Sequence, residues 1–385
     1  MGLDFSLSEE QQLLVDAATD FVRRECPPEL VREHARAGTF DESLWKKFAA
    51  TGWLGLGISP EYGGSGGTVL DAALVLEVTA PVHEAIGPTF ATMCFGGQML
   101  ESMGTPEQKA ELLPRLVDGD AKFALSITEP GGGTDVLGAM KTNAKRVDGG
   151  WVINGSKVFT SASTDADYLV VVARTSPPGA KQAHGVSVFL VDRHAPGVTL
   201  TRIPAMNDED TNSAFYEDVL VGDDRLLGEL DRGFYGLLGM LNNERIGIGA
   251  MCVGWGQAAI DQARAYALER EAFGGVIGRF QAVQHHLARM YLLVEQARWL
   301  VYRAAWMQSE GRPCGLEATA AKSVAAENVF QACDLGMQVM GGIGYTTECD
   351  INRYWRRVRL FRLAPISNEM ALNSIAEWLG MPRSF

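Results

Sequence analysis

The sequence lacks the features of secreted, membrane-spanning and nucleic-acid-binding proteins. Its six cysteines are scattered, without C-x-x-C pairs or zinc-site spacing, so we expect reduced thiols. No apolar run approaches the roughly 20 residues of a membrane-spanning helix. Lys and Arg number 34 against 47 Asp and Glu, a net charge of −13, which disfavours a broad nucleic-acid-binding face. No basic stretch precedes an apolar segment at the start, so we expect no signal peptide and a cytoplasmic location.

Several common catalytic motifs are also missing. The chain has no G-x-G-x-x-G, Walker A, H-E-x-x-H or G-x-S-x-G sequence. The adjacent pair His285 and His286 lies in a helical pattern, where neighbouring side chains point about 100° apart and would not share a metal ion. We therefore expect no metal site.

Glycine, in contrast, is abundant, and the hydrophobic period changes twice along the chain. The 43 glycines are about one and a half times average usage, and many stand in doublets and triplets, which suggests backbone lying against a large ligand. The first third reads as helical, with a possible capping box between Ser6 and Glu9 and a second helix from Asp41.

The middle of the chain reads as antiparallel strands. Asp148-Gly149 and Asn154-Gly155 stand at hairpin-turn positions, and strands are predicted at 168–174, 185–192, 197–203 and 213–221. Helical periodicity then returns in 281–310 and 316–341, as in a helix bundle. We predict three domains: residues 1–121 helical, 122–230 β, and 231–385 helical.

One polar segment stands where the first helical part meets the β part. Residues 123–135 offer the hydroxyls of Ser126, Thr128 and Thr134, three consecutive glycines and Asp135. Its backbone N–H groups could hold a pyrophosphate or the polar edge of a flat ring. A tight loop between domains explains the same residues equally well.

Further motifs follow in a recognisable order, and with this segment the chain resembles the acyl-CoA dehydrogenases from its first helix to its last. The family signature T-E-P-x-x-G-[ST]-D is matched at 128–135, R-x-x-F-G at 270–274 and Q-x-x-G-G-x-G-[YF] at 338–345. The resemblance implies a mainly α chain with a central β domain. In that fold an N-terminal α-helical domain precedes an antiparallel, barrel-like β domain and a C-terminal four-helix bundle.

The resemblance also implies FAD as cofactor. The backbone of Ile127 and the hydroxyl of Thr128 would meet the pyrimidine side of the flavin, and Thr134 would lie near the pyrophosphate and the substrate tail. In the stretch that usually reads W-x-T, Phe159 replaces Trp, and Ser161 replaces the Thr that bonds flavin N5. Further implied FAD contacts, several of them to the neighbouring subunit, are Thr160, Arg270, Phe273, Gln281, Gln338, Gly341, Gly342, Ser367 and Glu369.

Family members oxidise an acyl-CoA thioester to the 2,3-enoyl-CoA: a carboxylate removes the α-proton while the β-hydride passes to flavin N5. In many members this carboxylate precedes a turn near the C-terminus, but the aligned residue here is Pro365. In the isovaleryl and long-chain types it precedes an Arg on the first C-terminal helix, which makes Glu244 the predicted base. Asn242 and Arg245 would lie near the CoA tail.

Other activities of the same fold stay open. Relatives carry out desulfination, nitroalkane oxidation or flavin-dependent hydroxylation, and a catalytically silent flavin-binding subunit is a further alternative. The resemblance implies a homodimer or homotetramer that passes electrons to electron-transfer flavoprotein. It leaves the acyl chain, the pathway and the choice between dimer and tetramer undetermined.

Overall fold

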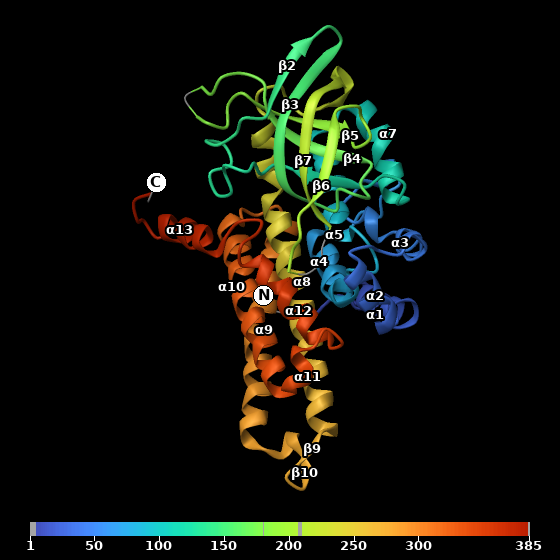
Figure 1. Cartoon of the computed structure of the whole chain (residues 1–385), viewed down its shortest axis with the longest axis vertical. Coiled ribbons are helices and arrows are strands. Elements are labelled where there is room, and N and C mark those ends of the chain that lie inside the picture. Colours follow the sequence, from blue (N-terminus) through green and yellow to red (C-terminus); the bar gives the residue numbers. More distant parts are fainter. Residues whose placement is uncertain (1–4, 180, 207–209, 384–385) are drawn as a thin grey trace. The chain divides into compact units, whose positions relative to one another are not determined.

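The structure, a computed structural model, describes residues 5–179, 181–206 and 210–383 (Figure 1). These residues form two compact units. The helical unit consists of the chain up to Glu33, of Thr68–His83 and of the chain from Asn242 onwards. The β unit consists of His34–Gly67 and Glu84–Leu241. The predicted fold class, mainly α with a central sheet, is confirmed. The domain boundaries at 121 and 230 stay predictions.

The β unit is built on a sheet in the order β6-β7-β3-β2-β4-β5-β8, with β1 beside β4. Pairs of strands that follow one another in this order are antiparallel, except β2 and β4, which share one parallel pair at Asn143 and Arg174. The β1–β4 pairing is also parallel, and the segment with the β2–β3 hairpin provides the long connection that parallel strands require. The strands are β1 (Phe123–Ser126), β2 (Asn143–Val147), β3 (Gly150–Ser161), β4 (Tyr168–Arg174), β5 (Val186–Asp192), β6 (Val198–Arg202), β7 (Thr211–Gly222) and β8 (Leu226–Leu227).

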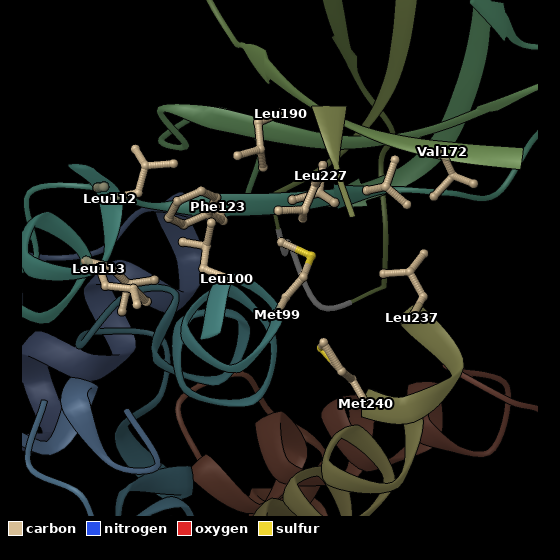
Figure 2. Packing of buried hydrophobic residues seen from close by; sticks show 14 of the residues in the cluster. Met99, Leu100, Leu112, Leu113, Phe123, Val172, Leu190, Leu227, Leu237 and Met240 are labelled. Carbon is tan, nitrogen blue, oxygen red and sulfur yellow. The ribbon is translucent and has the colours of Figure 1, made fainter. Parts of the chain in front are cut away.

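The central residues of β4 and β5 are mostly apolar and buried because both faces of the sheet are covered here. Val170, Val172 and Leu190 belong to one buried cluster, which includes residues of the helices before β1 (Figure 2). Leu169 and Val171 belong to a second cluster on the opposite face. The helices of this unit are α3 (Glu42–Ala49), α5 (Thr89–Ala91), α6 (Gly97–Met103) and α7 (Pro106–Val117), with a π-helical segment at Thr92–Gly96.

The helical unit is organised around α10, which packs against α9, α12 and α13. Helix α4 packs against α1 and α9 in the same unit. The buried stripe of α9 runs through Met290, Val294, Ala297 and Val301, in agreement with the helical periodicity predicted for 281–310. The helices are α1 (Glu9–Glu25), α4 (Val69–Thr79), α9 (Gln281–Ser309), α10 (Gly315–Met340), α11 (Gly342–Tyr345), α12 (Asp350–Phe361) and α13 (Asn368–Trp378). Helices α2 (Pro28–Ala37) and α8 (Gly233–Glu269) each contain residues of both units.

Two local predictions were wrong. The first helix is capped by Ser8 and Gln11 rather than by Ser6 and Glu9, because only the former pair exchanges both capping hydrogen bonds. Asn154-Gly155 is not a turn: β3 continues through it with a β-bulge against β7. Gly155 has φ 151°, and a Cβ there would lie 2.4 Å from Thr142 Oγ1, so the glycine serves close packing inside the sheet. The Asp148-Gly149 turn between β2 and β3 is confirmed.

Candidate functional site

Glu244 lies on α8 with only 8% of its surface exposed. Burial raises the pKa of its carboxyl to about 8, although the charges of Arg245 and Lys322 act in the opposite direction. A carboxylate in such a setting is poorly solvated and therefore a stronger base than one in water. The position has the electrostatic character expected of a general base.

The predicted CoA-binding residues lie beside Glu244 in the sequence and on the same helix. Arg245 donates to Asn242 Oδ1 at 3.4 Å, and Asn242 in turn contacts Cys314 Sγ at 3.6 Å. Burial lowers the pKa of Arg245, while Glu244 raises it. The structure thus brings Asn242, Glu244 and Arg245 together on one stretch of α8, and their roles stay predictions.

Lys322 on α10 is a charged neighbour that our sequence analysis missed. Its side chain is fully buried, and its Nζ donates to the carbonyl of Ile366 at 2.5 Å and to Asn368 Oδ1 at 3.1 Å. Burial lowers its pKa to about 8, while Cys252 and Glu244 raise it. The only signal in the sequence is a lysine within the apolar face of a helical stretch. Lys322 therefore ties the turn before α13 to the interior of the helical unit.

Three residues singled out from the sequence lie in this turn or in the first turn of α13. Pro365 is exposed, and Ser367 caps α13 by accepting a hydrogen bond from the Met370 amide at 3.3 Å. Glu369 lies in the first turn of α13, where its own backbone amide and Ser367 lower the pKa of its carboxyl. Both side chains stand at a helix N-terminus, whose amides suit an anionic group.

Three further predicted residues of this unit lie at the exposed hairpin between α8 and α9 or just after it. Arg270 directly precedes the two-stranded hairpin of β9 (Glu271–Ala272) and β10 (Gly275–Val276), and Phe273 at its tip is 93% exposed. Gln281 is exposed at the first position of α9. A large aromatic side chain so exposed does nothing for the core of its own unit and is available for contact with another molecule.

Gln338, Gly341 and Gly342 mark the junction of α10 and α11. Gly341 ends α10 with φ 59°, which favours glycine, and a Cβ at Gly341 or Gly342 would meet no atom within 4 Å. The open space leaves this backbone free for a ligand or a second chain to approach closely.

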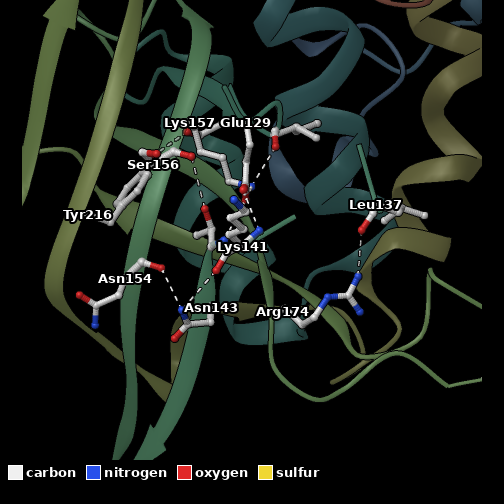
Figure 3. Close-up of polar contacts among 12 residues, drawn as sticks. Glu129, Leu137, Lys141, Asn143, Asn154, Ser156, Lys157, Arg174 and Tyr216 are labelled. Atoms are coloured by element: carbon white, nitrogen blue, oxygen red, sulfur yellow. Dashed lines mark hydrogen bonds and ion pairs between the residues drawn. The ribbon is translucent and has the colours of Figure 1, made fainter. Parts of the chain in front are cut away.

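In the β unit, Ile127 and Thr128 continue from the end of β1 and are held by β3. Figure 3 shows Lys157 of β3 beside Glu129. Lys157 Nζ donates to the Ile127 carbonyl at 2.9 Å, and the Val158 amide donates to the Thr128 carbonyl at 2.8 Å. Lys157 also pairs with Glu129 at 3.0 Å. Neither Lys157 nor the structural role of Glu129 was predicted from the sequence.

The glycines after Thr128 keep the backbone accessible. A Cβ at Gly131 or Gly133 would meet no atom within 4 Å, whereas one at Gly132 would lie 2.3 Å from Ala139. Thr134 is exposed at the end of this run, and Asp135 caps the following turn through the Gly138 amide at 3.0 Å.

The end of β3 presents one aromatic ring and two hydroxyl groups. A bulge between Lys157 and Thr160 accompanies a left-handed Phe159, φ 57°, whose side chain is 64% exposed. Thr160 is buried, with its Oγ1 3.2 Å from Ser126 Oγ, and Ser161 donates to Thr211 Oγ1 at 3.2 Å. The Thr160 hydroxyl thus belongs to the interior of the unit, and Phe159 is the exposed group of the three.

These features of the β unit fit FAD. A flat ring with a polar edge needs backbone or hydroxyl donors, as at Ile127 and Thr128, and an apolar surface such as Phe159. A pyrophosphate needs accessible backbone amides, as at Gly131 and Gly133. Among the described residues no group of three or more His, Cys, Asp or Glu could hold a metal ion, and no helix there could cross a membrane.

Comparison with known proteins covers nearly the whole chain. The acyl-CoA dehydrogenase N-terminal domain matches residues 8–120, the middle domain 124–219 and the C-terminal domain 231–380. A probable acyl-CoA dehydrogenase of Bacillus subtilis, YngJ, is 35% identical over 98% of this chain and 100% of its own length.

Solved structures are similar to this chain over nearly its whole length. The butyryl-CoA dehydrogenase of Megasphaera elsdenii has a TM-score of 0.91 at 31% identity, over 98% of this chain and 100% of that one. The structure described as PigA with FAD and proline also has a TM-score of 0.91, at 27% identity, over 98% of this chain and 99% of that one. The signature motifs, the order of elements and these matches agree, and the chain belongs to the acyl-CoA dehydrogenase family.

Proposed function

We propose that this protein oxidises an acyl-CoA thioester to the corresponding 2,3-enoyl-CoA, with Glu244 as the base. FAD is its cofactor. The observation that carries the proposal is a carboxyl group on α8 that is almost completely buried and whose pKa burial raises to about 8. A purely structural Glu on a helix would more often lie at the surface, paired with a cation in water.

Glu244 removes the α-proton of the substrate and holds it on its carboxyl group. The α C–H bond of a thioester is a weak acid, so a base with a raised pKa is better matched to it than an ordinary carboxylate. Burial of Glu244 also keeps water from competing for the proton. Bound FAD supplies the acceptor for the hydride that leaves the β-carbon.

The thioester oxygen needs hydrogen-bond donors as negative charge develops on it. In relatives one donor is the backbone N–H at the position of Pro365, and proline has none. We infer that the next amide, that of Ile366, takes this role here. Lys322 supports it by holding the Ile366 carbonyl at 2.5 Å, which restricts the backbone of this turn.

The remaining contacts divide between the substrate and a second subunit. We propose that Asn242, Arg245 and Thr134 bind the CoA portion, and that Arg270, Phe273 and Gln281 contact the FAD of a neighbouring copy in a homodimer or homotetramer. Electron-transfer flavoprotein is the proposed electron acceptor. The cytoplasmic location stays a prediction.

Pro365 favours a second candidate, a flavoenzyme of the same fold with different chemistry, such as a desulfinase, nitroalkane oxidase or hydroxylase. One of the similar structures, PigA, is described with FAD and proline, and proline is not an acyl-CoA. Glu244 argues against this candidate and also against a catalytically silent subunit, because neither explains a carboxyl group buried at the position of the family base.

The test is the anaerobic addition of acyl-CoAs of different length and branching to the purified holoenzyme. Substrate oxidation should bleach the visible flavin absorbance with at least one of them. The Glu244→Gln variant should keep FAD and fail to bleach, whereas Glu310→Gln, which alters an exposed carboxylate, should behave as wild type. Flavin that stays oxidised with every acyl-CoA would exclude the proposed function.

A further inference from the structure

A lysine with no exposed surface lies in the middle of the sheet of the β unit. Lys157 on β3 is fully buried, and the carboxylate of Glu129 beside it is 6% exposed. A buried charge is costly unless it is paired and fully hydrogen-bonded, so a lysine at such a position calls for a specific role. Neither residue takes part in the chemistry proposed above.

The hydrogen bonds around this pair are nearly complete (Figure 3). Besides the ion pair, Glu129 accepts from the amide of Lys141 at 2.7 Å and from that of Thr142 at 2.9 Å. Burial alone would raise the pKa of Glu129, but Lys157 and these amides lower it below its usual value. Burial lowers the pKa of Lys157, and Glu129 counteracts this. The geometry is that of a buried ion pair, with 3.0 Å between Lys157 Nζ and the Glu129 carboxylate.

The second partner of Lys157 connects the pair to the predicted flavin contact. Its Nζ donates to the Ile127 carbonyl at 2.9 Å. In a trans peptide the carbonyl and the following N–H point in opposite directions. Because the Ile127 carbonyl points at the buried Lys157, the Thr128 N–H points away from it, and both residues are partly exposed. The next carbonyl, that of Thr128, is held separately by the Val158 amide at 2.8 Å.

We propose that Lys157 is a positioning residue for FAD: by binding the Ile127 carbonyl from inside the sheet, it orients the Thr128 amide toward the polar edge of the flavin ring. Glu129 keeps Lys157 in place and ties the segment to residues 141 and 142. This inference rests on the proposed function in one respect, the contact of Ile127 and Thr128 with FAD. It adds two residues that do not touch the cofactor themselves.

Variants of the pair separate positioning from folding. Lys157→Met removes the donor to Ile127 and should raise the dissociation constant for FAD at least about tenfold, equivalent to about 1.4 kcal/mol. Glu129→Gln keeps Lys157 as donor and should change this constant by less than about threefold, or about 0.6 kcal/mol. Lys122→Met is the matched control, since Lys122 pairs with Glu42 at 2.9 Å in the same unit. Release of FAD from purified holoenzyme, followed by flavin fluorescence, gives the constants.

The double variant Lys157→Met with Glu129→Leu covers the case in which Lys157→Met does not fold. It leaves no unpaired charge, so its melting temperature should return toward that of wild type, while FAD binding should stay at least about tenfold weaker. Binding within about threefold of wild type in the folded double variant would overturn the proposal.

Hydrogen exchange on the wild-type protein adds a test that needs no variant. FAD should slow exchange of the Thr128 amide, and an amide that exchanges equally fast with and without FAD would also overturn the inference. If the wild type binds no FAD at all, the proposed function fails. If it binds FAD and Lys157→Met releases it no faster, only the role of Lys157 fails.

Discussion

Replacement of Glu244 by Gln tests the base through both activity and stability. The two side chains are nearly isosteric, so the variant should fold and keep FAD while turnover falls by about 10² to 10⁴, the usual contribution of a general base. Because the proposed base Glu244 would act in its deprotonated form, kcat/KM of the wild type should rise with pH through an apparent pKa near 8, the value to which burial raises it.

The same pKa predicts how stability depends on pH. The ordinary value for Glu is 4.5 and the folded-state value is about 8, so the folded protein binds this proton more tightly than the unfolded chain does. The stabilisation by protonated Glu244 is complete below pH 4.5 and is lost as the pH rises to about 8, which amounts to roughly 5 kcal/mol in total. Gln does not titrate, so its advantage over Glu should grow with pH in that range.

Urea unfolding at a fixed FAD concentration measures this advantage. Between pH 6 and pH 9 the free energy of unfolding of Glu244→Gln, relative to wild type, should increase by about 3 kcal/mol and level off above pH 8. Glu310→Gln, on the surface, should give no such trend. A pH-independent difference, together with turnover of Glu244→Gln within about threefold of wild type, would refute the assignment of the base.

Three further substitutions have defined outcomes. Arg270→Ala should lose FAD and dimer stability together, because FAD bound only by the assembled state stabilises that state, and full FAD occupancy in a monomer on size-exclusion chromatography would contradict this. Pro365→Ala should change kcat little if Ile366 already supplies the donor; a large gain would mean that the wild type lacks an oxyanion donor worth about 2.7–4 kcal/mol. Lys322→Met removes a charge that lowers the pKa of Glu244, so the acid limb of kcat/KM should move to higher pH, while Lys322→Arg should keep it in place. An unmoved limb in Lys322→Met would show that this charge does not act on the base.

Local patterns in the sequence were enough to predict which segments form helices or strands and to identify the family. Helical periodicity in 281–310 and 316–341 agrees with α9 and α10, and the Asp148-Gly149 turn stands between β2 and β3 as expected. These features depend on neighbours a few residues apart, which a linear reading captures. The turn predicted at Asn154-Gly155 was wrong. This dipeptide is typical of hairpin turns, but here it lies inside β3, where Gly155 packs against Thr142.

The sequence by itself determined the order of helical and β segments and the family motifs, and through the family resemblance it led to the prediction of Glu244 as the base. Only the tertiary structure decided that Glu244, Lys157 and Lys322 are each buried in their own units. A lysine in a sequence is normally read as exposed, and the partners that make burial tolerable are distant along the chain. Glu129 lies 28 residues from Lys157, and Ile366 lies 44 residues from Lys322. Such pairs form only when the strands and helices pack, because desolvation and long-range hydrogen bonding depend on the complete fold.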